Sequence, residues 1–449
     1  MKISDELTVK IEKISNLGTG IARIDGCVVF VENVCPEDEV KIRITKVKKN
    51  FAAADVVEII SSSPHRIKPF CPMLKVCGAC QLQMIDYDYQ LEIKRQIVED
   101  SIRKIGGLDV EIPLPVPSPE IKNYRHKIQF PISQTKVSKR LLAGYYKPQS
   151  HEIVNIKYCP VQPEICDRII DFIRENALKF QISGYEEKTH TGDLRHIVIR
   201  VSRYSGKILV ALVVNSGGSN RSLKNFAMEI FNNFDEVTGV CLNFNTQKSN
   251  VILGKKTECV VGSDYVEEKL LDKVFKIGAD TFFQINPASA ENIFAYVRNY
   301  IKDNYDSPLV MDAYAGISTF GICLADVSDK VVTIEENPES CKKAEESLVM
   351  NKVNNVEIHS GDAAEFFKKE NRRFDVSIID PPRKGCTKES LDEVLRLTKG
   401  EIIYVSCNPA TLARDLKYLC EKGCSVKSIQ SFDMFCHTYH IENVAIIEV

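Results

Sequence analysis

A cysteine stands where the chain leaves a predicted strand and enters a predicted helix. Cys407 follows the apolar run 402–405, and Asn408 and Pro409 lead into a helix predicted over 410–421. A thiol near a helix N-terminus has its thiolate stabilised, and the thiolate is the nucleophilic form. A free cysteine is usually a buried apolar residue, but such a residue belongs inside a strand rather than at its end. The position therefore favours Cys407 as a nucleophile.

The tail 432–444 gathers groups that can move a proton. Glu442, His437 and His440 lie just before the strand predicted over 444–447, together with a tyrosine. Such a cluster can supply a general base. A single histidine more often has a structural role, so neither His437 nor His440 is assigned to the reaction on its own.

The run 310–321 predicts a strand, a tight turn and the start of a helix, and it contains Asp312 and Gly316. Glu335 ends the next predicted strand and follows Gly316 by about 20 residues. This is the spacing at which an acidic residue holds ribose hydroxyls in Rossmann-type units. Asp362 follows the third strand, where an adenine would lie. The motif G-x-G-x-x-G is absent, which disfavours a dinucleotide. The single-turn pattern favours S-adenosylmethionine.

Two prolines fix the turn after the fourth predicted strand of this region, 376–379. The run Asp-Pro-Pro-Arg-Lys-Gly occupies residues 380–385. In open α/β sheets, ligands bind at the carboxyl ends of the strands. A turn with only a structural role rarely needs this combination, so we expect Asp380 to line a ligand crevice.

Four cysteines have a spacing typical of a metal centre. Cys71, Cys77 and Cys80 form a C-x5-C-x2-C pattern, and Cys159 follows much later, just before a proline. Four thiolates spaced in this way suit a [4Fe–4S] cluster. Zinc is the main alternative, but it usually pairs its cysteines as two C-x2-C units, and only one is present. Chance clustering in a cysteine-rich chain is the third interpretation.

The composition limits the classes of protein to consider. The chain has 449 residues, 44% apolar and 27% charged, which suits a globular protein of about three domains. No apolar run reaches the ~18–20 residues of a membrane span, and the N-terminal residues lack the apolar stretch of a signal peptide, so a cytoplasmic location is expected. In that compartment its 16 cysteines are buried thiols, metal ligands or nucleophiles rather than disulfides. The 59 basic and 61 acidic residues exclude a protein that is basic throughout.

Three stretches must position these groups. Residues 1–61 predict about five short strands separated by turns, which suit a small closed barrel of the OB type. Residues 62–265 mix strands and helices, and an early helix, 89–106, is expected to pack on the C-terminal domain. Residues 266–449 alternate strands and helices with the βαβ rhythm of a doubly wound sheet. The N-terminal strands are predicted at 7–14, 20–24, 27–31, 39–47 and 51–60.

Two local segments are basic although the whole chain is not. The segment 41–49 places Lys41 and Arg43 on one face of a strand, and a solvated edge strand is the alternative interpretation. The segment 122–147 interleaves basic and aromatic residues, a mixture that suits phosphate contact and base stacking. A charged surface over aromatic core residues would have the same composition. RNA phosphates are expected along these two segments.

Taken together, the motifs resemble those of the RNA uracil-5-methyltransferases. The similar runs are 380–385, 406–415 and 437–442, with Phe-Gln-Ile-Asn at 283–286. The resemblance covers nearly the whole chain, and the N-terminal strands resemble the family's TRAM domain, an OB-like RNA-binding barrel. Cys436 departs from the family pattern, which has proline there, but it lies beside the base segment rather than in it.

The resemblance implies roles for individual residues. Cys407 would add to carbon 6 of uracil, so that carbon 5 becomes nucleophilic enough to take a methyl group. Glu442 would then remove the proton from carbon 5. The target uridine would be flipped out of its stack. The positions that match the family's S-adenosylmethionine contacts are Gln284, Tyr314, Glu335 and Asp380, and those that match the ligands of its cluster-bearing branch are Cys71, Cys77, Cys80 and Cys159.

The implied fold is multidomain α/β. It consists of a TRAM barrel over 1–61, a central α+β RNA-binding domain with the iron–sulfur cluster over 62–265, and a Rossmann-like methyltransferase domain over 266–449. The implied substrate is structured RNA, with 23S rRNA favoured over tRNA by the barrel and the cluster. No membrane and no obligate protein partner are implied.

Two alternatives stay open. One is a tRNA uracil-5-methyltransferase. The other is an RNA-binding iron–sulfur protein whose methyltransferase fold is inactive, although intact Cys407, Glu442 and Asp380 argue against it.

Overall fold

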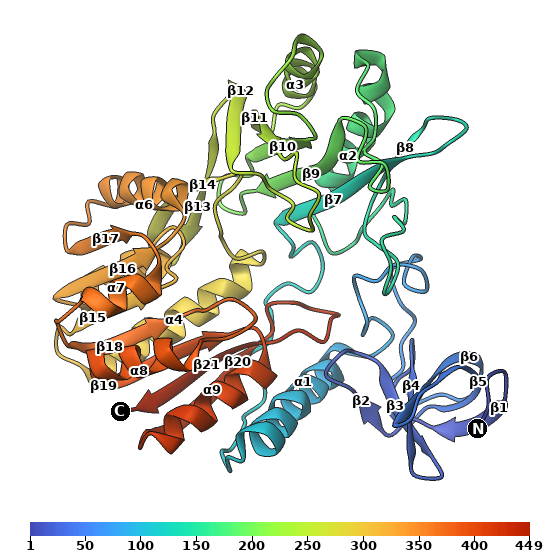
Figure 1. Cartoon of the computed structure of the whole chain (residues 1–449), viewed down its shortest axis with the longest axis horizontal. Helices are drawn as coiled ribbons and strands as arrows, with labels where there is room; N and C mark the ends of the chain where they lie inside the picture. Colours follow the sequence, from blue (N-terminus) through green and yellow to red (C-terminus); the bar gives the residue numbers. More distant parts are fainter.

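The strands of the protein form four sheets. The computed structural model describes residues 1–449. In Figure 1 the N-terminal strands (blue) lie at the lower right, the central sheet (green) at the top, and the C-terminal sheet (orange to red) at the lower left. None of the helices has the length and apolar character needed to span a bilayer.

The N-terminal sheet has six strands in the order β1-β5-β6-β4-β3-β2 around a small apolar core. The strand predicted over 7–14 is in fact two strands, because the chain bends at Ile11, whose amide bonds to the Asp38 carbonyl. The edge-strand interpretation of the basic segment is wrong, because β5 lies between β1 and β6. The strands are β1 (Glu6–Lys10), β2 (Lys13–Ile14), β3 (Gly20–Ile24), β4 (Cys27–Val31), β5 (Glu39–Val47) and β6 (Phe51–Ser61).

The central sheet is covered on both faces. All seven residues of β10 are buried; Val210 and Leu212 join the core beneath α2 and α3, whereas Leu209 and Val213 join the core shared with the C-terminal domain. This two-sided burial explains the uninterrupted apolar run of the strand. The sheet contains β7 (Lys127–Gln134), β8 (Leu141–Ala143), β9 (Leu194–Val201), β10 (Ile208–Val214), β11 (Val237–Phe244) and β12 (Lys256–Gly262), and its helices are α2 (Glu164–Asn176) and α3 (Arg221–Asn233).

A hairpin of β13 (Tyr265–Leu270) and β14 (Lys273–Gly278) joins the central sheet to the C-terminal domain. Phe275 and Ile277 of the hairpin lie in the same apolar core as Leu209 of the central sheet and Val310 of the C-terminal sheet. The two larger parts therefore share a continuous core.

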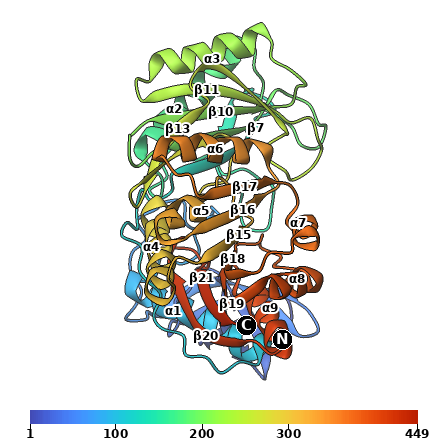
Figure 2. The same ribbon diagram turned by 90° about the vertical axis from the view of Figure 1, so that its left-hand side faces the viewer.

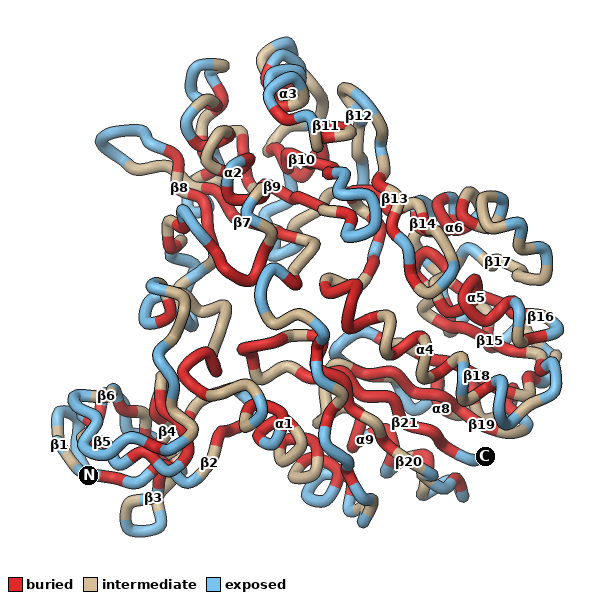
Figure 3. Tube along the Cα trace, turned by 180° about the vertical axis from the view of Figure 1, so that it is seen from behind, coloured by how far each residue is buried: buried red, intermediate tan, exposed pale blue.

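The C-terminal sheet has seven strands in the order β17-β16-β15-β18-β19-β21-β20. The five strands from β17 to β19 are parallel, and β21 runs antiparallel to both of its neighbours. Figure 3 shows the middle strands buried along most of their length. They are β15 (Leu309–Ala313), β16 (Lys330–Glu335), β17 (Val356–Ser360), β18 (Phe374–Ile379), β19 (Thr398–Ser406), β20 (Ser425–Phe432) and β21 (Glu442–Glu448).

Helices cover both faces of this sheet (Figure 2). Ile403 and Val405 of β19 face the core beneath α4 and α5, whereas Ile402 and Tyr404 face the core beneath α8 and α9. This arrangement confirms the predicted doubly wound fold. The helices are α4 (Pro287–Asn304), α5 (Thr319–Leu324), α6 (Pro338–Asn351), α7 (Ala363–Lys369), α8 (Lys388–Leu397) and α9 (Pro409–Glu421).

Helix α1 (Tyr87–Ser101) connects the N-terminal barrel to the C-terminal domain. It lies beside α9 in Figure 1, and Val98 packs into the same core as Leu412 of α9. On its other side, Ile93 and Ile97 pack with Ile14 of the barrel. The barrel is therefore held against the C-terminal domain by apolar contacts through α1.

Candidate active site

A crevice of about 1070 Å³ lies at the carboxyl ends of the parallel strands. Helices begin directly after these strand ends, so polar side chains of several turns converge there. All six residues that the sequence marked for catalysis or cofactor binding line this one crevice: Gln284, Tyr314, Glu335, Asp380, Cys407 and Glu442.

The glycine turn after β15 is held by the acid at the end of β16. The Gly316 amide donates a 2.8 Å hydrogen bond to Glu335 Oε2, and the Asn337 amide donates one of the same length to Oε1. Tyr314 has a φ of 65°, a left-handed conformation that turns the chain sharply at the strand end. The turn and the acid thus form one rigid edge of the crevice.

Two carboxyl groups, those of Asp312 and Asp380, lie close to this edge. Asp312 is fully buried, and its Oδ2 accepts a 3.2 Å hydrogen bond from the Gly321 amide, while Oδ1 has no partner. Burial raises the pKa of Asp380, after β18, to about 7. Because low-polarity surroundings disfavour the charged form, these carboxyl groups hold protons more readily than exposed ones.

Cys407 lies between the end of β19 and the start of α9, where Asn408 caps the helix through its side chain. Burial raises the pKa of the Cys407 thiol to about 11, and the nearby Glu442 adds to this shift. The positive charge of Arg383 opposes the shift and lowers the pKa of the thiol. The helix N-terminus that the sequence indicated is present, and the pKa of the thiol is nevertheless raised.

Glu442 is the first residue of β21 and is buried. Its pKa is raised well above the ordinary value, first by burial and then by Asp380, and Arg383 again acts in the opposite direction. Sequence reasoning noted Arg383 only as part of the Asp-Pro-Pro-Arg turn. The structure adds that this guanidinium is the positive charge close to both Cys407 and Glu442.

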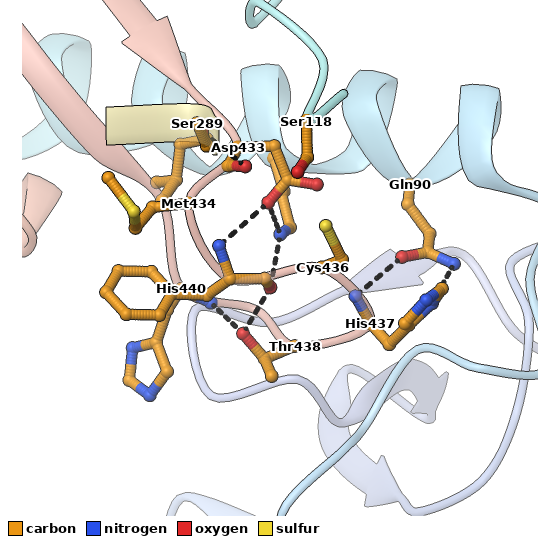
Figure 4. A network of polar contacts seen from close by, with 12 residues as sticks. Gln90, Ser118, Ser289, Asp433, Met434, Cys436, His437, Thr438 and His440 are labelled. Atoms are coloured by element: carbon orange, nitrogen blue, oxygen red, sulfur yellow. Dashed lines mark hydrogen bonds and ion pairs between the residues drawn. The ribbon is translucent and has the colours of Figure 1, made fainter. Parts of the chain in front are cut away.

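The loop before Glu442 is fixed by polar contacts with α1 (Figure 4). The Gln90 side chain accepts a 3.1 Å hydrogen bond from the His437 amide and approaches the His437 ring nitrogen Nδ1 at 3.3 Å. The other ring nitrogen lies 2.7 Å from the Ile121 carbonyl. Since both ring nitrogens are occupied within the protein, His437 has a structural role.

A buried ion pair anchors the same loop. Lys94 of α1 donates hydrogen bonds to Asp433 Oδ1 at 2.6 Å and to the Phe435 carbonyl at 3.0 Å, and both charged side chains are fully buried. Ser289 of α4 donates a 3.0 Å hydrogen bond to the Asp433 carbonyl. Sequence reasoning missed Lys94, because a lysine in an amphipathic helix is usually exposed and nothing in the local pattern marks this one.

His440, by contrast, faces the crevice. Burial lowers its pKa to about 4, so the imidazole is neutral at physiological pH. Its ring lies 4.2 Å from the ring of Tyr439, centre to centre. The tail cluster therefore divides into one structural histidine and one that lines the site.

The four cysteines of the predicted metal centre line a single small cavity in the central part of the chain. Cys71, Cys77, Cys80 and Cys159 surround it with mostly apolar neighbours. Burial raises the pKa of Cys80 to about 12, and the thiols of Cys77 and Cys71 add to that shift. The donor set fits an iron–sulfur cluster in number and type. However, no group of three or more His, Cys, Asp or Glu side chains is arranged to hold a single metal ion.

The basic segments differ in their surroundings. Lys41 and Arg43 of β5 each form a 2.8 Å ion pair with Glu6 of β1, which partly neutralises that face. In the segment 122–147, Arg125 lines the crevice, and its guanidinium lies 5.5 Å from the ring centre of Tyr145. The second segment therefore reaches the candidate active site.

Three features together define an S-adenosylmethionine-dependent methyltransferase. They are a doubly wound sheet with this strand order, a glycine turn whose amide bonds to a strand-end acid, and a crevice at the carboxyl ends of the strands. Residues 86–448 match the model of the tRNA (uracil-5-)-methyltransferase family, and residues 2–57 match the TRAM domain. The chain belongs to the RNA uracil-5-methyltransferase family.

Full-length relatives agree with this assignment. An RNA methyltransferase of Gloeobacter violaceus is 38% identical over 98% of this chain and 96% of its own length. One from Oceanobacillus iheyensis is 36% identical over 98% of this chain and 95% of its own length; both are named as uncharacterized RNA methyltransferases. The crystal structure of the Pyrococcus abyssi tRNA (uracil-54, C5)-methyltransferase in complex with S-adenosyl-L-homocysteine superimposes with a TM-score of 0.78. It covers 98% of this chain and 100% of that one, at 29% identity.

Proposed function

We propose that this enzyme transfers a methyl group from S-adenosylmethionine to carbon 5 of one uridine in structured RNA, through a covalent adduct at carbon 6. The observation that carries the proposal is the placement of Cys407 and Glu442 at the ends of paired strands, in a crevice that also holds the four expected cofactor contacts. A protein that only binds RNA has no need of a half-buried thiol beside a buried acid.

The side chains of the crevice account for the steps. Cys407 loses its proton to water and its sulfur bonds to carbon 6 of the uracil, which makes carbon 5 an enolate carbon. Bound S-adenosylmethionine supplies an electrophilic methyl group for that carbon. Glu442, once it has given its own proton to water, takes the proton from carbon 5 as a carboxylate; the bond between sulfur and carbon 6 then breaks, and the ring double bond is restored. Arg383 stabilises the thiolate in the first step and the carboxylate in the third.

The cofactor contacts divide between two sides of the crevice. Glu335 and Tyr314 belong to the glycine-turn edge, where Glu335 would accept hydrogen bonds from ribose hydroxyls. Gln284 comes from the segment before α4, and Asp380 from the turn after β18. The methyl donor would then lie between the glycine turn and Cys407.

We further propose 23S rRNA as the RNA and a [4Fe–4S] cluster on Cys71, Cys77, Cys80 and Cys159. The convergence of four cysteines, one buried and three half-buried, on one cavity supports the cluster, which would order the surface beside Arg125. A tRNA substrate is the second candidate, because the Pyrococcus abyssi structure that matches the full chain is that of a tRNA methyltransferase.

The test is methylation in vitro with tritiated S-adenosylmethionine. The purified protein is incubated separately with unmodified 23S rRNA and with unmodified tRNA transcripts, and digested RNA is analysed for 5-methyluridine and mapped. Label recovered as 5-methyluridine in 23S rRNA supports both the proposed reaction and the proposed RNA. Label in tRNA alone overturns the substrate assignment, and label at a position other than carbon 5 in either RNA overturns the reaction.

A further inference from the structure

A second cavity opens on the far side of the nucleophile. It has a volume of about 300 Å³ and lies between the N-terminal barrel, α1 and the active site. Its lining includes Asn16 and Leu17 from the barrel, Ile97 from α1, and Cys407. Because Cys407 also lines the main crevice, the two cavities adjoin at this residue.

The barrel turn that closes this cavity is seated firmly. Gly18 has a φ of 79°, and a Cβ there would lie 2.8 Å from both Gln81 Cβ and Tyr439 Cδ1. Only glycine permits the turn to approach Gln81 and Tyr439 this closely. Beside it, Ile14 packs with Ile97 of α1 in a buried cluster. The turn is therefore part of the wall rather than a mobile extension.

The lining suits a nucleotide. It contains one guanidinium, from Arg383, and no carboxylate. Tyr439 and His440 supply aromatic rings, and Asn16 supplies an amide. Single-stranded nucleic acid is held by this combination of positive charge and stacking surfaces. The volume lies at the lower end of the range for ligand sites, which fits one nucleotide rather than a helix of RNA.

We infer that this cavity, the flanking pocket, holds the nucleotide next to the target uridine, with Leu17 of the barrel packing against its base. The inference rests on the proposed function. When the target base lies on Cys407 with the methyl donor towards Tyr314 and Glu335, the RNA strand must continue away from the donor. The flanking pocket is the space that adjoins Cys407 on that side.

Leu17 is the side chain that tests the inference. It lies at the tip of the turn with 64% of its surface exposed, so Leu17→Ala leaves the barrel core intact. Ile3 has the same exposed fraction in the same domain and does not line the pocket. Ile3→Ala is therefore the matched control.

The experiment measures kcat/KM for methyl transfer by wild type and both variants. The substrate is a transcript of about 20 nucleotides around the uridine methylated in vitro, intact or with the base removed from the nucleotide on its 5′ or its 3′ side. We expect Leu17→Ala to lower kcat/KM about tenfold on intact RNA, the scale of one base contact. On RNA that lacks one of the two neighbouring bases, Leu17→Ala should have no further effect, whereas Ile3→Ala should behave as wild type on every RNA.

The outcomes distinguish a failure of the flanking pocket from a failure of the proposed function. If wild type methylates the intact transcript but Leu17→Ala has no effect, or lowers kcat/KM equally on all three RNAs, the pocket does not hold a neighbouring base and the proposed function stands. If wild type methylates no uridine at all, the proposed function fails and the inference fails with it.

Discussion

Ser406 and Asn443 lie directly opposite each other in the antiparallel pairing of β19 and β21. The Asn443 side chain also donates a 3.0 Å hydrogen bond to the Ser406 carbonyl. This register places the next residues, Cys407 and Glu442, on facing chain ends. The antiparallel strand β21 is thus what brings the acid to the thiol, since a parallel strand in its place would begin at the opposite edge of the sheet.

Replacing Cys407 with alanine should abolish methyl transfer while leaving RNA binding within about twofold of wild type, because the thiol forms the covalent bond but few of the binding contacts. Methyl incorporation and filter binding measure the two properties. Cys420→Ala, on the same helix and away from the crevice, is the control and should retain full activity. Turnover by Cys407→Ala would exclude the covalent mechanism.

Replacing Glu442 with glutamine should arrest the reaction after methyl transfer. The amide has the same shape but cannot take the proton from carbon 5, so the bond between sulfur and carbon 6 persists. We expect a protein–RNA adduct that survives denaturing electrophoresis and contains the transferred methyl group. The double variant Cys407→Ala/Glu442→Gln must lack the adduct, and its persistence there would place the bond on another residue.

Local patterns predicted the elements that carry the site, but not how the distant ones meet. The strand 356–360 and the helix 338–351 have the predicted bounds, since apolar periodicity is a local property. In contrast, β20 was not predicted, because its exposed half alternates with polar residues at the edge of the sheet. The pair of Lys94 and Asp433 joins residues 339 positions apart, and no local pattern specifies such a contact.

Glu442→Gln should also stabilise the free enzyme, increasingly so as the pH rises. The pKa of Glu442 is raised in the folded protein, so between its unfolded and folded pKa values the native state holds more protons, and the free energy of unfolding falls with pH. Glutamine removes this cost. We expect the Tm of the variant to be close to that of wild type at about pH 4 and at least roughly 2 °C higher at pH 8. The conversion is about 2–4 °C of Tm per kcal/mol for a domain of about 150–250 residues, the size class of the C-terminal domain.

Scanning calorimetry at several pH values measures the effect. Glu448→Gln, at the exposed end of the same strand, is the control and should show no gain that grows with pH. An equal Tm difference at all pH values would mean that the Glu442 carboxyl is not protonated in the folded enzyme.

Lys94→Met should destabilise the protein by about 3–5 kcal/mol, because it leaves Asp433 buried without its partner. Urea denaturation followed by circular dichroism measures the loss. Arg95→Met removes the neighbouring exposed pair with Glu92 and should cost less than about 1 kcal/mol. A further change of Asp433 to leucine should recover part of the stability of Lys94→Met, and failure to do so would show that the lysine acts mainly through the Phe435 carbonyl.

Cys80→Ala should remove the proposed [4Fe–4S] cluster without unfolding the chain. Anaerobically purified wild type is expected to contain about four iron atoms per chain, bound by four thiolates, and little zinc. Cys80→Ala should lose most of that iron and the visible absorption of the cluster, and its RNA affinity should fall because the surface beside Arg125 is no longer ordered.

Cys166→Ala is the matched control, because Cys166 is a buried thiol of α2 that does not line the cavity. One zinc per chain would replace the cluster assignment, and full RNA affinity in iron-free protein would show that the centre has no part in RNA binding.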